Sequence, residues 1–172
     1  MKYLLIIFCL LFTSVGWSKD ISIDDLVERD GFYYEKFTDV PFSGNVIGEE
    51  QGKIIKGKRE GEWLRYYDNG QLRIKDNYKD GKREGEFLSY HENGQLKIKN
   101  NFKDGKMDGE RLEYYESGPL WHKSNWKDGK AEGEWLQYHE NGQLLMKKNH
   151  KDGKIEGKTL WFDDNGQLKF EH

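Results

Sequence analysis

Apolar and polar residues alternate along short segments of this chain, and the segments recur at a fixed spacing. From Gly57 to His172 the same pattern occurs five times, with 24 residues from one copy to the next. In the first copy, Glu62–Tyr67 and Gln71–Tyr78 have the alternation of β-strands. Repetition with a period of about 20 to 50 residues is typical of arrays in which each unit buries its apolar face against its neighbours. The pattern predicts an all-β array of hairpins.

Turns are expected wherever Asn-Gly or Asp-Gly separates two such segments. A three-residue loop ending in a left-handed glycine would put Tyr66 opposite Leu72 and Leu64 opposite Ile74, which builds a single apolar face. The same loop at the next turn would place Leu72 opposite Leu88. The expected turn glycines are Gly70, Gly81, Gly94, Gly105, Gly118, Gly142 and Gly166.

These hairpins predict an elongated antiparallel meander. Gly61 and its equivalents lie at the start of a strand with no turn to make, which predicts a kink or the close approach of an aromatic ring. The face opposite the apolar one carries aromatic rings flanked by Lys and Arg, a common composition of recognition surfaces. Such rings also pack across strands in any antiparallel sheet, so a purely structural role stays open. The candidate partner-binding residues are Trp63, Arg65, Tyr67, Phe87, His91, Tyr115, Trp121, Trp135 and His139.

The first 18 residues have the order of a secretory signal peptide. Lys2 precedes the apolar run Leu4–Phe12, and small or polar residues follow as far as Ser18. The run is shorter than the roughly 20 apolar residues of a spanning helix. Cys9 lies within the run without a small residue before it, so a lipid anchor is not expected. We expect an exported chain, periplasmic or extracellular, with a signal peptide (1–18), an N-terminal segment with a shortened first repeat (19–56), and five repeats, the last truncated (57–172).

Composition limits the choice of partner. The chain has a net charge of −3, and removal of Lys2 with the leader makes it more negative. Nucleic acid is therefore not an expected partner, because binding to phosphate backbones needs a basic surplus. A lipid membrane is an alternative that the net charge does not support. Cys9 is the one cysteine, so the processed chain forms no disulfide.

The sequence contains few residues in patterns typical of catalysis or metal binding. His91 and His139 occupy the same column two repeats apart, too far for one zinc ion. No serine lies in a Gly-x-Ser-x-Gly motif, and the carboxylate pairs arise from the repeat or lie in turns. We expect no cofactor, no metal site and no catalytic residue.

Residues 31–172 resemble a known family. Asn69-Gly70-Gln71-Leu72, then Lys79-Asp80-Gly81-Lys82 and Gly85-Glu86-Phe87, are similar to the bacterial variant of the MORN repeat found in YwqK-type proteins. The resemblance implies an all-β array used for binding, and members are often described as antitoxins of toxin–antitoxin pairs. A cytoplasmic toxin conflicts with an exported chain.

Three functions follow as expectations. The first is a non-enzymatic exported scaffold that binds a protein partner through the aromatic and basic face. The second is an antitoxin or immunity role against a toxic protein. The third is carbohydrate binding, because Trp and Tyr on a sheet can stack against sugar rings.

Overall fold

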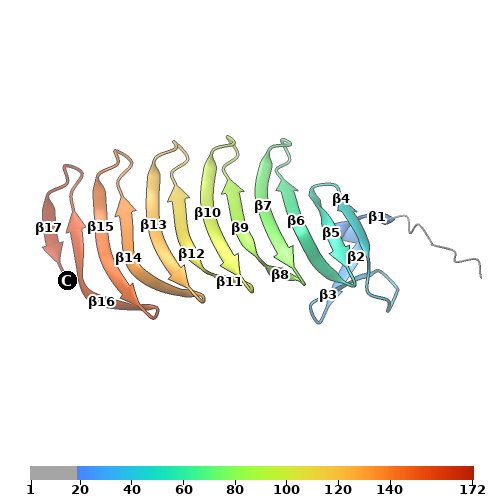
Figure 1. Ribbon diagram of the computed structural model, residues 1–172. Coiled ribbons are helices and arrows are strands. Elements are labelled where there is room, and N and C mark those ends of the chain that lie inside the picture. Colours follow the sequence, from blue (N-terminus) through green and yellow to red (C-terminus); the bar gives the residue numbers. More distant parts are fainter. Residues whose placement is uncertain (1–18) are drawn as a thin grey trace, which may run out of the picture.

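Residues 19–172 form one long curved β-sheet with a small hairpin beside it. The computed structural model places 15 strands in this sheet and 2 in the hairpin, and Figure 1 shows the strands following one another along the molecule. Strand pairs are antiparallel apart from one parallel pair at the N-terminal end. The predicted all-β, elongated meander of repeated hairpins is confirmed. The predicted signal peptide, residues 1–18, lies outside the described residues.

The N-terminal segment supplies the first strands of the sheet and the separate hairpin. Its elements are β1 (Lys19–Ser22), the 3₁₀ helix η1 (Ile23–Asp25), β2 (Leu26–Arg29), β3 (Phe32–Glu35), β4 (Gly44–Ile47) and β5 (Glu50–Ile55). β1 pairs in parallel with β4, and β5 leads into the repeats. β2 and β3 pair with each other in the second sheet.

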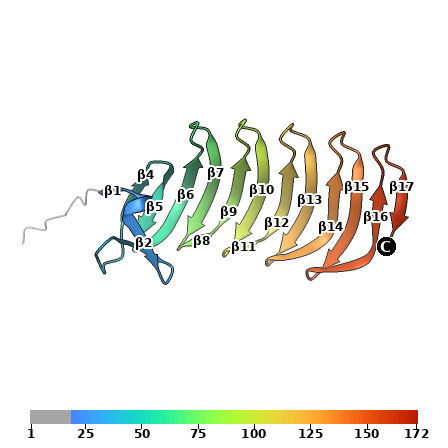
Figure 2. The same cartoon turned by 180° about the vertical axis from the view of Figure 1, so that it is seen from behind.

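Five hairpin units follow, which we number 1 to 5 and which span residues 57–80, 81–104, 105–128, 129–152 and 153–172. Their strands are β6 (Lys58–Tyr66), β7 (Leu72–Lys79), β8 (Lys82–Arg83), β9 (Gly85–Tyr90), β10 (Leu96–Lys103), β11 (Lys106–Met107), β12 (Gly109–Tyr114), β13 (Leu120–Lys127), β14 (Lys130–Tyr138), β15 (Leu144–Lys151), β16 (Lys154–Phe162) and β17 (Leu168–Glu171). β8 and β11 are short lead-ins to β9 and β12. Figure 2 shows the same stack from behind, with the hairpin tips aligned along both edges.

The tip of each hairpin is the predicted three-residue loop. In unit 1 the N–H of Tyr67 donates to the carbonyl of Gln71, and the N–H of Gly70 donates to the carbonyl of Tyr67, both at 2.8 Å. The glycines at this position have φ between 79° and 107°, as predicted. They are Gly70, Gly94, Gly118, Gly142 and Gly166.

One extra residue interrupts the ladder just below each tip. Tyr66 pairs with Leu72 as predicted, but Leu64 then pairs with Lys75 and not with Ile74. The other four hairpins have the same shift. A β-bulge of this kind moves the following side chains of one strand to the other face. The predicted single apolar face is therefore wrong.

The turns between units are tighter than predicted. Lys79 pairs with Lys82, so only Asp80 and Gly81 form the loop, and their φ values are 51° and 81°. Two-residue loops with both φ values positive match the twist of paired strands, and aspartate tolerates this conformation better than most residues. The glycines predicted here, Gly81 and Gly105, are turn residues, but the predicted three-residue loop is wrong.

A second shift in register occurs at the glycine that starts the main part of the next strand. Beyond Gly85 the pairing has moved by two residues, so Leu88 pairs with Lys75 and not, as predicted, with Leu72. The φ of Gly85 is 86°, and equivalent glycines also have positive φ. The predicted kink is confirmed. The alternative of an aromatic approach is wrong, because a Cβ on Gly85 would meet no atom within 4 Å.

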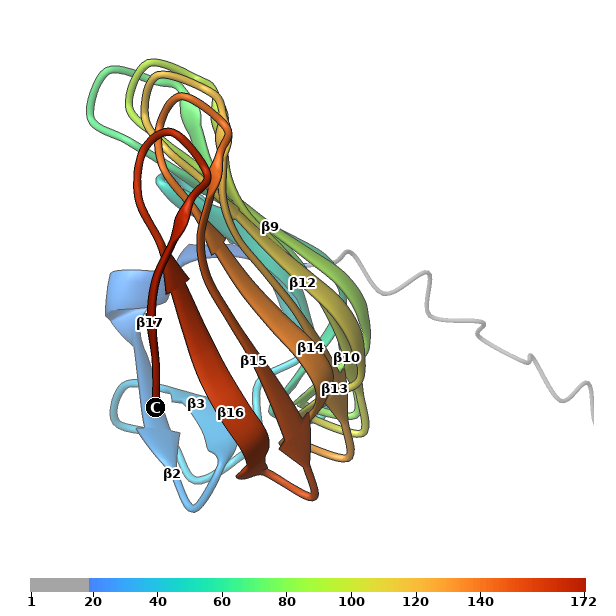
Figure 3. The ribbon, with the colours of Figure 1, turned by 90° about the vertical axis from the view of Figure 1, so that its left-hand side faces the viewer.

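The two shifts sort the side chains into two faces, since directly paired residues share a face. A row on one face contains Glu50, Arg65, Ile74, Ser89, Ile98, Glu113, His122, Gln137, Met146, Trp161 and Phe170. The adjacent row on the other face alternates leucine with lysine: Leu64, Lys75, Leu88, Lys99, Leu112, Lys123, Leu136, Lys147 and Leu160. Figure 3 shows the sheet end-on as a curve with the β2–β3 hairpin on its hollow side. We call this hollow side the trough and the leucine–lysine side the outer face.

Residues of the N-terminal segment close the trough over unit 1. The buried apolar cluster consists of Ile21, Leu26, Phe42, Val46, Ile54 and Trp63. Trp63 is only 1% exposed, and a side chain on Gly52 would collide with its indole ring. The prediction that Trp63 is accessible to a partner is wrong, because residues outside the repeats cover it.

We expect Trp63→Ala to lower the free energy of unfolding by about 3 to 5 kcal/mol, since it removes the largest side chain of this cluster. Leu88→Ala should cost about 2 kcal/mol or less, because Leu88 is half-buried on the outer face. Urea unfolding followed by circular dichroism measures both. A larger cost for Leu88→Ala would show that the leucine face is the true core.

We also expect Gly94→Val to cost about 1 to 3 kcal/mol, because Gly94 has a φ of 85° and a β-branched residue is strained there. Lys97→Ala, at an exposed position nearby, is the control and should change stability by less than about 0.5 kcal/mol. Thermal melts compare the two. Equal effects would mean that this tip is not held in the left-handed conformation.

Candidate functional site

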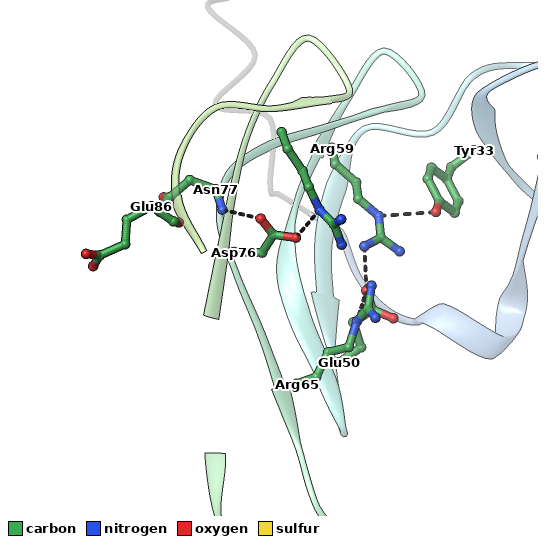
Figure 4. A network of polar contacts seen from close by, with 8 residues as sticks. Tyr33, Glu50, Arg59, Arg65, Asp76, Asn77 and Glu86 are labelled. Atoms are coloured by element: carbon green, nitrogen blue, oxygen red, sulfur yellow. Dashed lines mark hydrogen bonds and ion pairs between the residues drawn. The ribbon is translucent and has the colours of Figure 1, made fainter. Parts of the chain in front are cut away.

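Three arginines in the first part of the trough, Arg59, Arg65 and Arg83, each have a carboxylate partner. Arg59 Nη1 lies 2.8 Å from Glu50 Oε1, and Arg65 Nε donates to the same oxygen at 3.2 Å. Figure 4 shows Glu50 between these two arginines. In the next unit, Arg83 Nε donates to Asp76 Oδ2 at 2.7 Å, and the Asp76 residue is 3% exposed. Buried charges persist when they are paired, so these pairs let the trough keep charged groups in its floor.

A third carboxylate lies deeper in the array. Glu113 Oε1 accepts hydrogen bonds from Arg111 Nε at 2.7 Å and from His122 Nδ1 at 3.1 Å. Burial alone would raise the pKa of Glu113, but the bonds from His122 and Arg111 outweigh it and lower the pKa. His122 is 2% exposed, so the carboxylate fixes the orientation of a buried ring.

Aromatic rings form a continuous cluster across units 3 and 4. The ring of Trp135 lies 4.3 Å from His122, 5.1 Å from His150 and 6.1 Å from Trp126, centroid to centroid. Trp121 extends the cluster, 6.0 Å from His122. The three tryptophans are partly exposed, whereas both histidines are buried. Units 3 and 4 therefore offer tryptophan rings at the surface of the trough on a buried histidine floor.

One cation borders this cluster without a carboxylate partner among the described residues. Lys148 Nζ lies 4.9 Å from the centroid of Trp135, and Lys148 is partly exposed. Lysine ammonium groups are attracted to the face of a tryptophan ring, more strongly where water is excluded. Lys148 and Trp135 together present a positive charge beside an aromatic surface.

A regular row of lysine–glutamate ion pairs runs along the outer face. Lys75 Nζ lies 2.6 Å from Glu62 Oε2, and Lys99 Nζ lies 2.7 Å from Glu86 Oε2. Lys123 and Lys147 have equivalent pairs in units 3 and 4. Each exposed pair adds little stability, and the leucines between the lysines are half-buried. These four outer-face lysines are each paired with a glutamate, whereas Lys148 in the trough has no carboxylate partner among the described residues.

Four predicted binding residues connect one unit to the next. The hydroxyl of Tyr67 donates to the carbonyl of Tyr90 at 2.8 Å, and Nε2 of His91 bonds the carbonyl of Tyr114 at 3.1 Å. Equivalent bonds start from Tyr115 and His139. These side chains have structural partners, and their contact with another protein stays a prediction.

The remaining predicted residues share the trough. Arg65 lies in the ion pairs of unit 1, and the rings of Phe87 and Phe102 are 6.1 Å apart in unit 2. Trp121 and Trp135 belong to the cluster of units 3 and 4. Alternate positions on first strands were therefore sufficient to place Arg65, Phe87 and Trp135 on one face, whereas Trp121 is the inserted residue of a second strand.

Other trough residues were missed. His122, Trp126, Lys148 and His150 lie on second strands, where the bulge reverses the expected alternation. Lys148 neighbours Lys147 in sequence and lies on the opposite face. The signal that could have revealed them is the run of rings at 24-residue spacing, Tyr78, Phe102, Trp126 and His150.

Two shallow hollows flank the tip of unit 1. One of about 460 Å³ is bordered by Tyr67, Arg73 and Glu92, and the other, of about 410 Å³, by Arg65 and Glu50. Within residues 19–172, no three His, Cys, Asp or Glu side chains are grouped so as to hold a metal ion. No helix in this part of the chain is both long and apolar enough to cross a membrane.

The repeating geometry agrees with a known sequence family. The model of the MORN repeat variant matches residues 59–80, 83–104, 107–128, 131–152 and 155–172, more than half of the chain. This chain belongs to the MORN repeat variant family. Each matched MORN segment begins two residues before a kink glycine, such as Gly61 or Gly85, and the first four continue through both strands of a unit. A search of the curated proteins gave no match.

Two titratable groups in the trough of the MORN array, His150 and Glu113, should make the free energy of unfolding fall as the pH falls. Burial, and to a lesser extent the charge of Lys148, lower the pKa of His150, so the unfolded chain takes up a proton at higher pH than the folded one. The stability that neutral His150 provides is present near pH 8 and is lost as pH falls through its unfolded pKa, about 6.5. The lowered pKa of Glu113 acts in the same direction below about pH 4.5.

We therefore expect the free energy of unfolding to fall between pH 8 and 5, and His150→Gln to reduce this fall. Urea unfolding at a series of pH values measures it. The matched variant Glu113→Gln should alter the profile mainly at lower pH. An unchanged profile for His150→Gln between pH 8 and 5 would contradict the assignment.

Proposed function

We propose that this chain is an exported, non-enzymatic MORN scaffold that binds a protein partner in its trough. The supporting observation is the contrast between two parts of the trough. Trp63 in unit 1 is covered by the N-terminal segment, whereas Trp121, Trp126 and Trp135 in units 3 and 4 are partly exposed. Tryptophan is among the residues that most often anchor protein interfaces.

The outer face supports the same choice by contrast. Its row of lysines is paired with glutamates and the leucines between them are half-buried, so a partner finds no unpaired lysine in this row. In the trough, Lys148 and the exposed parts of the tryptophans are available for new contacts. A protein partner would bury these rings, which provides more free energy than exposed ion pairs do.

Export and the lack of catalysis rest on the sequence. Lys2, the apolar run Leu4–Phe12 and the small residues up to Ser18 support a cleaved signal. Because the units repeat one pattern, none of them provides a single distinct position for a group of catalytic residues, which supports a binding role. The finer affiliation with bacterial, YwqK-type antitoxin-like proteins is a narrower form of the proposal, in which the partner is an exported toxic protein.

The test is capture of partners by the chain expressed with its own leader in its native cells. The trough variant combines Trp121→Ala with Lys148→Gln, and the outer-face control combines Lys123→Ala with Lys147→Gln. The trough variant should weaken capture about tenfold or more, equivalent to about 1.4 kcal/mol, and the control should leave it unchanged. Mass spectrometry measures capture, and N-terminal sequencing, expected to begin near Lys19, checks export.

Circular dichroism and melting of all variants check that folding is retained. If capture is equally weakened by the outer-face control, the trough is not the binding face. If a glycan array gives trough-dependent binding while no protein is captured, carbohydrate binding replaces the proposal.

A further inference from the structure

The chain's own N-terminal hairpin shows which chemistry the trough accommodates. Strand alternation and the pairing of Glu28 with Tyr33 place Leu26, Glu28, Tyr33 and Glu35 on one face of the hairpin. Leu26 belongs to the buried cluster with Trp63, and Tyr33 packs at its margin. This hairpin face carries one aliphatic residue, one tyrosine and two carboxylates.

The trough meets that face with a cation among aromatic rings. The guanidinium carbon of Arg59 lies 4.2 Å from the ring centroid of Trp63, 5.4 Å from that of Tyr78 and 5.3 Å from that of Tyr33. Arg59 Nε also donates to the Tyr33 hydroxyl at 3.1 Å. The main chain adds a bond from the N–H of Tyr33 to the carbonyl of Gly57 at 2.7 Å. A cation among aromatic rings is thus the surface on which the leucine and tyrosine of this hairpin dock.

Units 3 and 4 present a similar surface, a cation beside aromatic rings, that is formed by different residues. The positions equivalent to Trp63 and Tyr78 are Trp135 and His150 in unit 4, and unit 3 adds Trp126 at the second position. The position of Arg59 is taken by Ala131 in unit 4, but Lys148 supplies the cation over the Trp135 ring. The β2–β3 hairpin lies at the N-terminal end (Figure 1) and does not extend to these units.

Three carboxylates of the trough are paired with arginines, and one positive charge beside the tryptophans is left without a carboxylate partner among the described residues. The trough carboxylates Glu50, Asp76 and Glu113 are each bonded to arginine. Lys148 has no such partner in residues 19–172, although the whole chain has a net charge of −3. An incoming carboxylate therefore finds an unpaired cation beside apolar rings. In unit 1 the corresponding cation, Arg59, is already paired with Glu50 and meets the hairpin through the Tyr33 hydroxyl.

We propose that units 3 and 4 bind an acidic β-hairpin of a partner protein. It presents leucine and tyrosine as β2–β3 presents Leu26 and Tyr33 to unit 1, and its acidic residues complement the unpaired charge of Lys148. This inference rests on the proposed function and specifies its partner. The central contacts are Trp126, Trp135 and Lys148. A tyrosine of the partner stacks on the tryptophans, and a carboxylate pairs with Lys148.

The test uses a cyclised peptide with the sequence of residues 26–35 as the probe, titrated into the purified protein. NMR signals of the indole N–H groups of the five tryptophans that follow Lys19 report the position of binding. Saturable shifts of Trp126 and Trp135, with Trp63 unchanged, are expected. Lys148→Gln should weaken binding about fivefold or more. Lys147→Gln, which has the same charge change on the outer face, should weaken it less than about twofold.

A second peptide, with lysine in place of both glutamates that correspond to Glu28 and Glu35, should not bind. Equal binding of the two peptides, equal effects of the two lysine variants, or no shift at Trp126 and Trp135 at millimolar peptide would overturn the inference. Shifts at Trp63 alone would also overturn it, because they would mean exchange with the chain's own hairpin. If partner capture still depends on Trp121 and Lys148 in that case, the proposed function stands and only the acidic-hairpin chemistry fails.

Discussion

The rest of the structure depends on two interruptions of the β-ladder in every repeat. A residue is inserted after the leucine of the second strand, as at Leu72, and a left-handed glycine such as Gly85 shifts the pairing of the following strand. Without them, the leucines would share a face with the isoleucines and form an ordinary apolar layer. With them, leucine alternates with lysine on the outer face, and the tryptophans lie in the trough. Bulges also increase the local twist, which agrees with a sheet that curves around its own side chains.

Hydrogen bonds that recur between successive units explain why the period does not vary. Tyr67 bonds to the carbonyl of Tyr90 at one edge, and the N–H of Gly81 bonds to the carbonyl of Arg59 at the other, at 2.8 and 3.0 Å. An inserted residue would break both sets of bonds at once. Each unit therefore depends on its neighbours, as in other repeat proteins, and the N-terminal segment supplies the missing neighbour of unit 1.

Much of the fold could be predicted from the sequence, because turns leave strong local signals. Asn-Gly in four of the tips, and Ser117-Gly118 at the same place in the third, identified the loops and the positive φ of residues such as Gly94. The bulge left no such signal. The inserted residues have no shared chemistry that selects a bulge, and they are Arg73, Lys97, Trp121, Leu145 and Lys169. For the same reason the faces of the second strands were assigned wrongly.

The candidate site was predictable only in part. Trp121 and Trp135 were found because they lie on the predicted aromatic face, but Lys148 was missed because the bulge reverses its strand. Trp63 was misassigned for a different reason: the cover over it comes from Leu26 and other residues outside the repeat. His91 has a carbonyl partner 23 residues away, a contact that only the stacking of units creates.

Measuring which residues lie opposite each other in neighbouring strands is the most direct test of the two interruptions of the β-ladder. Nuclear Overhauser contacts between strands of the labelled protein identify which residues lie opposite each other. The account predicts contacts of Lys75 with Leu64 and Leu88, and of Ile74 with Ser89. Contacts of Ile74 with Leu64 and of Leu72 with Leu88 would instead show an uninterrupted apolar face, and would contradict the trough.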